Sequence, residues 1–188
     1  MSEMSSSAKA RALAVEAQID VDHEILDGAL HGAEEINANP LREGMFQAVT
    51  ANPCAMIIFG VSGDLTSLKL MPALYDLAMN SRLAEGFAVL GVSRRPWTDE
   101  QFRAEMRAAV EKHSQLPVTD ERWNSFAKGL FYVEGNFDEQ EMYDRLKTRL
   151  AELSHERRTE GNCLFYLATP PSFYTTIIRG LGTHELVE

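Results

Sequence analysis

The sequence predicts an α/β domain in which helices cover both faces of a parallel sheet. Four short apolar runs alternate with amphipathic helical patterns, and this alternation is typical of right-handed β-α-β crossovers. The first run has no polar residue, so we expect a strand covered on both faces there. The four runs occupy residues 54–59, 87–92, 130–133 and 162–168.

A glycine-bracketed turn follows the first run, and the rest of the chain is organised around it. Gly60 permits a turn that a side chain would obstruct, and Gly63 lets a phosphate approach the amides at the start of the next helix. The pattern indicates the dinucleotide-binding turn of a Rossmann-like fold, although an ordinary glycine turn between strand and helix has the same form. The turn comprises Gly60, Val61, Ser62, Gly63, Asp64 and Leu65.

Proline and capping residues locate the helices. Pro72 lies inside the first helical pattern and lacks an amide donor, so we expect a short turn over residues 64–68 and a main helix from about Lys69. Thr98 and Gln101 form a capping box that begins the next helix. The expected helices then run to about residue 114 and over residues 119–126, 138–155 and 169–180.

Length and charge restrict the classes of protein to which the chain can belong. With 188 residues, a formal charge of -10 and a pI near 5.0, the chain fits one acidic domain with a tail. Nucleic-acid binding is not expected, because it needs Lys and Arg gathered on one face. No apolar run approaches the roughly 20 residues of a membrane helix, and the N-terminus lacks the features of a signal peptide. We therefore expect a cytoplasmic protein with no membrane partner.

The chain divides into two expected regions. Residues 1–40 form a mobile acidic N-terminal extension, and residues 41–188 form the folded Rossmann domain. The sequence ends before a six-stranded order could be completed, so we expect the sheet to be incomplete. The two cysteines, Cys54 and Cys163, fall in predicted strands and are expected to be buried thiols.

Two arginines follow the second predicted strand. In a dinucleotide fold an acidic residue normally binds the ribose at this position, but Ser93, Arg94 and Arg95 occupy it here. Two guanidiniums suit a 2′-phosphate and favour NADP over NAD. The alternative is a solvated basic loop before Pro96, which would be the better interpretation if the loop did not follow the glycine turn by one β-α unit.

The residues alone indicate no catalytic group and no metal site. Lys69 is either a surface lysine or a positive charge at the mouth of the site, and its sequence context favours the surface. The Asp64 carboxylate suits local capping better than contact with a diphosphate. The five histidines lie in the tail, at helix ends or near the C-terminus. The sequence contains no nucleophile elbow, metal-ligand cluster or Walker motif.

Five segments taken together resemble the coenzyme domain of the glucose-6-phosphate 1-dehydrogenase family. The resemblance covers about residues 40–182. It implies oxidation of glucose 6-phosphate at C1 to 6-phosphoglucono-lactone in the pentose phosphate pathway, with NADP as cofactor and a homo-oligomer as the full-length enzyme. The segments are residues 58–65, 69–74, 91–98, 130–133 and 162–171.

The resemblance also assigns roles to residues. The turn from Gly60 to Leu65 matches the family's phosphate turn, Arg94 matches its 2′-phosphate arginine, and Arg95 assists. Lys69 matches a lysine near the reacting centre. The stretch beside the nicotinamide half of the cofactor is matched by Ala168, Pro170, Pro171 and Tyr174.

Several positions differ from the family pattern. The family usually has Ala at position 61 and Ala followed by basic residues at positions 66–68. These positions bear on cofactor affinity, and this chain has Val61, Thr66, Ser67 and Leu68 there.

Two classes of function stay open. The family's catalytic histidine segment and its sugar-binding sheet domain match nothing here, so we expect the isolated 188-residue chain to be inactive. The chain is then either the coenzyme part of an oxidoreductase or a non-catalytic NADP-binding or partner-binding remnant. A generic reductase or epimerase is a poorer third interpretation, because it leaves residues 162–171 unexplained.

Overall fold

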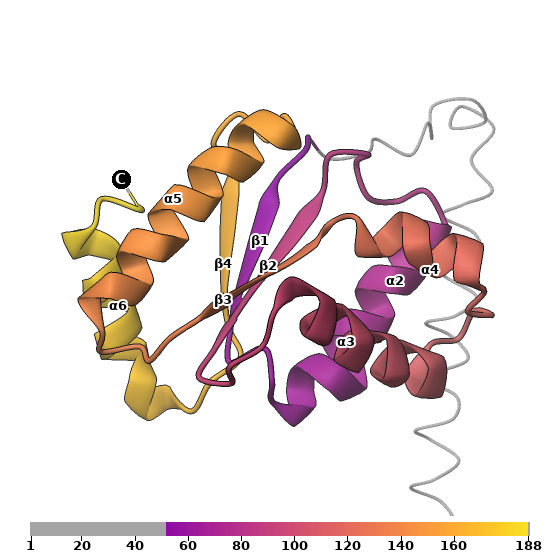
Figure 1. Cartoon of the computed structure of the whole chain (residues 1–188), viewed down its shortest axis with the longest axis horizontal. Helices are drawn as coiled ribbons and strands as arrows, with labels where there is room; N and C mark the ends of the chain where they lie inside the picture. The colour runs from indigo at the N-terminus through magenta and orange to yellow at the C-terminus, as the bar shows by residue number, and fades with distance from the viewer. Residues whose placement is uncertain (1–51, 188) are drawn as a thin grey trace, which may run out of the picture. The chain divides into compact units, whose positions relative to one another are not determined.

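The computed structural model describes residues 52–187, which fold around a four-stranded parallel sheet. The strand order is β3-β2-β1-β4. Helices α2, α3 and α4 cover one face of the sheet, and α5 and α6 cover the other (Figure 1). The structure therefore confirms the predicted Rossmann-like α/β class. The predicted extension, residues 1–40, and the start of the predicted domain lie outside the described residues.

All four predicted strands form, each within one residue of its expected bounds. Ile57 pairs with Leu90 on one side and with Phe165 on the other, and Leu90 pairs with Phe131. The carboxyl ends of parallel strands lie at the same end of the sheet, so the segments that follow the strands meet there. The strands are β1 (Ala55–Phe59), β2 (Ala88–Ser93), β3 (Leu130–Glu134) and β4 (Cys163–Leu167).

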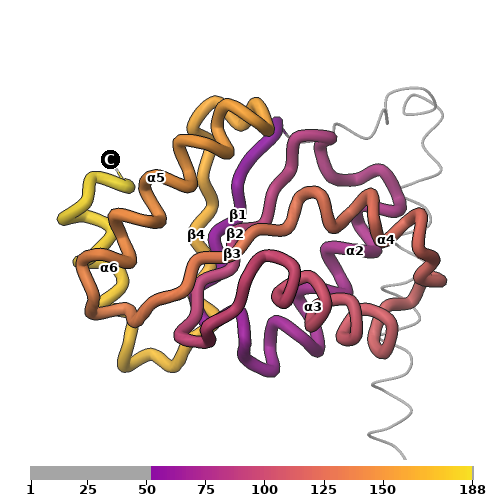
Figure 2. The backbone as a smooth tube through the Cα atoms, in the orientation of Figure 1, coloured from indigo at the N-terminus to yellow at the C-terminus, as the bar shows by residue number. Residues whose placement is uncertain are grey.

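The predicted helices also form, and the backbone trace lets their crossovers be followed (Figure 2). Thr98 makes both capping-box bonds: its Oγ1 accepts from the Gln101 amide at 3.2 Å, and its own amide donates to Gln101 Oε1 at 2.9 Å. The last helix continues past the predicted end at Gly180. The elements are η2 (Thr66–Leu70), α2 (Met71–Met79), α3 (Asp99–His113), α4 (Asp120–Ala127), α5 (Gln140–Glu156), η3 (Pro171–Phe173) and α6 (Tyr174–Thr183).

The expected division of the first helix at Pro72 takes a different form. The chain is helical from Asp64 onward without a gap, and the turn η2 is a π-helix. There the Met71 amide donates to the Thr66 carbonyl, five residues back, and α2 follows with Pro72 in its first turn. The missing proline amide is therefore accommodated by widening one turn, because a π-turn shifts the bonding pattern without ending the helix. The prediction of a separate helix from Lys69 was wrong in this respect.

Each face of the sheet carries its own apolar core. Alternate residues of β1 point to opposite faces, as the period of two requires. Ile57 and Phe59 pack with side chains of α5 and α6, whereas Met56 and Ile58 pack with side chains of α2, α3 and α4. The central strands are therefore buried on both faces, as predicted.

The β3 edge of the sheet is closed by side chains. The Tyr132 amide donates to Asp99 Oδ1 at 2.7 Å, Arg103 Nε donates to the Leu130 carbonyl at 3.0 Å, and Arg145 donates to the Glu134 carbonyl at 2.9 Å. Asp99 Oδ2 also lies 3.3 Å from Arg149. Helices α3 and α5 thus occupy outward-facing backbone groups of β3, which would otherwise offer a pairing edge.

The β4 edge differs from the β3 edge. Strand β4 is partly exposed along its whole length, and Leu164 is 52% exposed. Cys163 at its start is exposed, and Cys54 is half-buried just before β1, so the expectation of two buried thiols was wrong. An apolar run does not reveal which strand lies at an edge of the sheet, and this is the physical reason for the error at Cys163.

Among residues 52–187, no helix has the length and apolar character needed to cross a bilayer. The same residues contain no group of three His, Cys, Asp or Glu side chains placed to hold a metal ion.

Candidate functional site

A pocket of about 640 Å³ lies where the carboxyl ends of β1, β2 and β4 meet. The topology predicts a site at this position. After β1 the chain enters α2 on one face of the sheet, whereas after the neighbouring β4 it enters α6 on the other face, and ligands bind at such a switch point. Seven of the predicted cofactor residues line it: Gly60, Ser62, Gly63, Arg94, Arg95, Ala168 and Pro170. Three segments that are far apart in the sequence therefore meet at this pocket.

Gly60 is fitted closely into the turn. Its φ is +82°, a conformation that favours glycine, and an added Cβ would lie 2.6 Å from the Ala168 carbonyl oxygen. The Gly60 amide donates to the Val92 carbonyl at 2.8 Å, which fixes the turn against β2. The turn therefore passes directly against the end of β4 and leaves no room for a side chain.

The helix after the turn begins at Asp64. The Gly63 amide donates to the Gly60 carbonyl at 3.0 Å, so this amide is used within the turn. The amides of the first helical turn have no partner inside the helix and carry its positive end. Asp64 and Leu65 are exposed and do not line the pocket. Both were predicted to contact the cofactor as part of the turn.

Val61 is the third turn residue outside the pocket. Its side chain is fully buried and points to the α3 side of the sheet, where its methyl groups lie opposite Gly91 and near Phe102. The valine in place of the family's usual alanine therefore adds volume to the core and not to the pocket.

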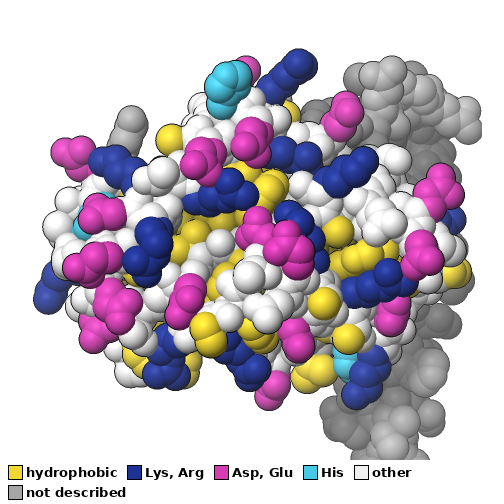
Figure 3. Space-filling view, in the orientation of Figure 1, with side chains coloured by type: hydrophobic (Ala, Val, Ile, Leu, Met, Phe, Trp, Pro, Cys, Tyr) yellow, Lys and Arg dark blue, Asp and Glu magenta, His cyan; other side chains and the backbone are white. Residues whose placement is uncertain are grey.

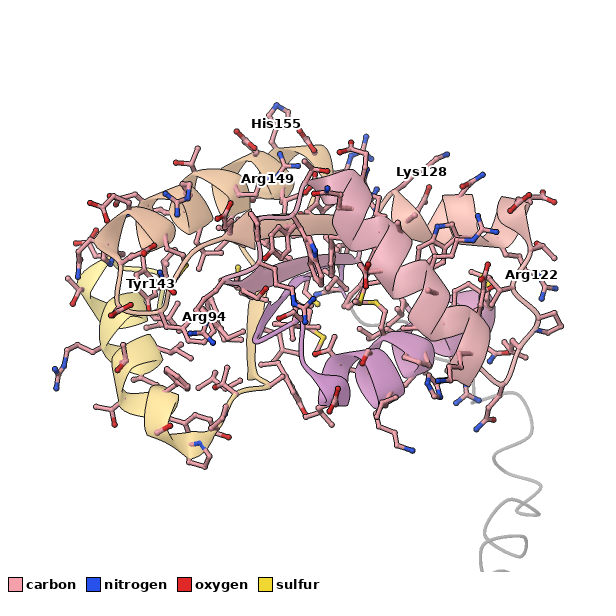
Figure 4. The ribbon with its side chains drawn as sticks, turned by 60° about the horizontal axis from the view of Figure 1, so that its bottom comes forward. Arg94, Arg122, Lys128, Tyr143, Arg149 and His155 are labelled. Atoms are coloured by element: carbon pink, nitrogen blue, oxygen red, sulfur yellow. The ribbon has the colours of Figure 1, made fainter. Side chains whose placement is uncertain are left out.

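The loop after β2 carries the two arginines. We call residues 93–97 the arginine loop. Arg94 and Arg95 are exposed, and the Arg95 guanidinium lies 5.1 Å from the centre of the Trp97 ring. Arg94 extends past the strand ends towards the side of the sheet that α6 covers (Figure 4), and it lines a second hollow with Phe173 and Thr176. The two positive charges thus flank the glycine turn without an ion-pair partner among the described residues.

The end of β4 closes the pocket. The Ala168 amide donates to the Phe59 carbonyl at 2.9 Å, which holds Ala168 beside Gly60. Thr169 lines the pocket, and its Oγ1 is buried without a hydrogen-bond partner in the described part of the chain. Pro171 and Tyr174 are exposed and do not line this pocket, contrary to the grouping that the sequence predicted.

Two aromatic residues of the pocket were not predicted from the sequence. Phe137 and Phe173 contact each other edge-to-face with ring centres 5.5 Å apart, and both line the pocket. Phe137 lies four residues beyond the third predicted strand. Ligands bind at the carboxyl ends of the strands, so this position was the one feature of the sequence that could have indicated Phe137. Ser93, Pro96 and Thr169 also line the pocket and adjoin predicted residues.

The catalytic candidate and the three histidines that the structure describes lie elsewhere. Lys69 is exposed in η2 and does not line the pocket. His113 and His155 are at the ends of α3 and α5, and His184 follows α6 with its Nδ1 2.9 Å from the Gly180 carbonyl oxygen. None of these residues is placed to act as a base in the pocket.

A larger hollow of about 770 Å³ lies between β3 and α5. Acidic and basic side chains line it, including Glu134, Arg145, Arg149 and Glu152, and Arg149 is paired with Glu152 at 2.6 Å. Figure 3 looks onto this side, where side chains of both signs surround an apolar area. Arg149 is already paired with Glu152 and no glycine turn lines this hollow, so the smaller pocket is the better candidate site.

The family model for the NAD-binding domain of glucose-6-phosphate dehydrogenase matches residues 57–188. The chain belongs to the glucose-6-phosphate dehydrogenase family. The match begins inside β1 and includes the glycine turn, the arginine loop and the end of β4, which are the three parts of the pocket.

Relatives in this family are similar to the chain over the same region. The glucose-6-phosphate 1-dehydrogenase of Chlamydia muridarum is 47% identical over 135 residues, which is 71% of this chain and 27% of the relative. That of Aggregatibacter actinomycetemcomitans is 45% identical over 136 residues, which is 72% of this chain and 27% of the relative. The chain thus spans about a quarter of the length of these relatives.

Solved structures give the same result. The glucose-6-phosphate 1-dehydrogenase of Mycobacterium avium matches with a TM-score of 0.62 and 25% identity, over 72% of this chain and 28% of that one. A glucose-6-phosphate dehydrogenase in complex with its substrate glucose-6-phosphate matches with a TM-score of 0.65 and 29% identity, over 74% and 29%. The fold and the family assignment therefore agree.

Proposed function

We propose that this chain supplies the NADP-binding part of a glucose-6-phosphate dehydrogenase, which oxidises glucose 6-phosphate at C1. The observation that carries the proposal is the pocket that joins Gly60, Arg94 and Ala168 at the carboxyl ends of three strands. NADP supplies the hydride acceptor when bound. The chain's own residues bind and orient it.

The residues of the pocket fit a dinucleotide. A Cβ at Gly60 would overlap the Ala168 carbonyl, so the turn can lie against the end of β4 only because that position is glycine, and a glycine turn at this place suits a diphosphate. Buried Thr169 Oγ1 offers an unused hydrogen-bonding group beside the turn. Arg94 and Arg95 can form charge-assisted bonds with a 2′-phosphate, which NAD lacks. These features support NADP as the preferred cofactor.

Chemistry at C1 needs a base for the hydroxyl proton. No described residue of the pocket can take this role, and Lys69 near the reacting centre stays a prediction from the resemblance. We propose that the isolated 188-residue chain binds the cofactor and does not turn over glucose 6-phosphate, and that a homo-oligomer is the form of the full-length family. The alternative, a non-catalytic NADP-binding chain, uses the same pocket.

Two glycine variants test the binding proposal. Gly60 and Gly161 both have φ near +80°, so an alanine strains the backbone at either position by about 1–2 kcal/mol. Only Gly60→Ala places a methyl group against Ala168, whereas nothing lies within 4 Å of an added Cβ at Gly161. Calorimetric titration should show NADP binding in wild type and Gly161→Ala and none in Gly60→Ala. Equal binding by both variants would contradict the proposed site.

NADPH absorbance with glucose 6-phosphate separates the two functions. The purified 188-residue chain should give no signal above buffer. A longer protein that contains this chain should give turnover if it is the coenzyme part of the enzyme, and NADP binding without turnover if the alternative holds.

A further inference from the structure

The side-chain hydroxyl of Tyr132 in β3 contacts the arginine loop, in addition to the backbone pairing between β3 and β2. Its hydroxyl lies 2.6 Å from the Arg95 carbonyl oxygen, 2.9 Å from the Ser93 carbonyl oxygen and 2.8 Å from Ser93 Oγ. Tyr132 and Ser93 are both buried, so water does not compete for these bonds. A single hydroxyl thus contacts both ends of the segment that holds Arg94.

The two shortest of these contacts can be hydrogen bonds at the same time, while the Ser93 carbonyl accepts from the Gly135 amide at 3.0 Å. The Tyr132 hydroxyl has one proton, which it donates to the Arg95 carbonyl, and it accepts from the Ser93 hydroxyl. Ser93 Oγ is also 3.4 Å from the Arg95 amide nitrogen. Burial is the main cause that raises the pKa of Tyr132, so its hydroxyl keeps the proton that this arrangement needs.

The tyrosine itself is held in place from the other side. Its amide donates to Asp99 Oδ1, and its ring packs against Trp97 and Phe102 with centres 5.7 and 5.5 Å away. Trp97 in turn lies under the Arg95 guanidinium. The position of the hydroxyl is therefore fixed by the sheet and the start of α3, and it can serve as a rigid support for the loop.

We propose that Tyr132 is a positioning residue that determines where the arginine loop presents Arg94 and Arg95, and hence the preference for NADP over NAD. The inference rests on the proposed function. Without the hydroxyl, the Arg95 carbonyl loses its tie to β3, and the γ-type bond that it accepts from the Trp97 amide, 2.8 Å long, opens more often. The two guanidiniums then spend less time where a 2′-phosphate would meet them, because pre-organisation lowers the cost of binding.

The test compares Tyr132→Phe with Tyr75→Phe in the 188-residue chain. Tyr75 is a matched control, since its buried ring also donates a hydroxyl bond to a carbonyl, that of Pro117 at 3.1 Å, but it packs beside α4. NADP and NAD are titrated into both variants. Tyr132→Phe should weaken NADP roughly 2- to 10-fold, the effect of one lost hydrogen bond, and leave NAD within about 2-fold. Tyr75→Phe should leave the ratio of the two affinities unchanged.

A measurement without nucleotide tests the same inference independently. Hydrogen exchange at the Trp97 amide should be faster in Tyr132→Phe than in wild type and unaltered in Tyr75→Phe. Ser93→Ala, which keeps the tyrosine bond to Arg95, should give a smaller increase. If wild type binds no NADP, the proposed function fails and Trp97 exchange alone decides whether Tyr132 holds the loop. An unchanged NADP to NAD ratio in Tyr132→Phe, or unchanged Trp97 exchange, overturns the inference.

Discussion

Val61 fits into the space that Gly91 leaves on the neighbouring strand. A Cβ on Gly91 would lie 2.8 Å from Val61 Cγ1 and 3.0 Å from Cγ2. Val61 follows β1 in the glycine turn, Gly91 lies within β2, and both are buried. The larger residue in the glycine turn is therefore matched by the absence of a side chain on β2.

This pairing predicts a non-additive pair of substitutions. Gly91→Ala should destabilise the chain by about 1–3 kcal/mol, because the new methyl group overlaps Val61. Val61→Ala alone should cost about 1–2 kcal/mol through the cavity it leaves. The double variant should cost less than the sum, which urea unfolding of all four proteins measures. Additive losses would show that the two side chains do not share this space.

Two glycines in α6 give a matched prediction on stability. A Cβ at Gly180 would lie 2.1 Å from Tyr143 Cζ, whereas nothing lies within 4 Å of one at Gly182. Gly180→Ala should lower the free energy of unfolding by about 1–3 kcal/mol, since α6 must move away from α5. Gly182→Ala should raise it by up to about 1 kcal/mol, because alanine loses less backbone entropy in a helix. Equal effects in thermal unfolding would contradict the packing of α6 on Tyr143.

Tyr143 also predicts how stability depends on pH. Burial, with a smaller effect of the Asp138 charge, raises the pKa of Tyr143 from 10.0 to about 12, and its hydroxyl donates to the Phe137 carbonyl at 2.7 Å. The pKa is higher in the folded state, so this contribution to stability is present below pH 10 and is lost as the pH rises towards 12. Urea unfolding between about pH 9 and 11 should show a steeper loss in wild type than in Tyr143→Phe. Parallel curves would rule the tyrosine out as the cause.

Asp99 should stabilise the chain more than its partly exposed side chain suggests. It accepts the Tyr132 amide and lies near both Arg103 and Arg149, so its removal leaves an outward β3 amide without a partner. Asp99→Ala should destabilise the chain by about 1–3 kcal/mol. The neighbouring Glu100 is exposed and lies 4.0 Å from Arg103, so Glu100→Ala should destabilise the chain less than Asp99→Ala does. Chemical denaturation of both variants checks the difference.

Most of the fold could be predicted from the sequence, because its signals are local. The apolar runs place each strand, and Thr98 and Gln101 make the two bonds that their spacing predicts. The exposure of β4 could not be predicted, since it depends on what lies beside the strand. The π-turn before Pro72 was also missed, because a helix can accommodate a proline without an amide either by ending or by widening one turn.

Part of the lining of the candidate site could be predicted from the sequence, namely residues of the glycine turn, the two arginines and the end of β4. Gly60 needs its positive φ, and this requirement is visible in the sequence. Phe137, Phe173 and Tyr132 were missed, because their roles depend on contacts between segments that are distant in the chain. From the sequence, Val61 was expected to bear on cofactor affinity, but its side chain packs opposite Gly91 in the core.

The central claim is that Arg94 beside the glycine turn selects NADP, and titration of NADP and NAD into wild type and Arg94→Ala tests it most directly. The variant loses a charge-assisted contact to the 2′-phosphate, so NADP binding should weaken by about 1.5–3 kcal/mol while NAD binding changes little. Arg122→Ala removes the same charge at α4, far from Arg94 in Figure 4, and should affect neither cofactor. Equal losses of NADP and NAD affinity in Arg94→Ala, or no NADP binding by wild type, would contradict the account.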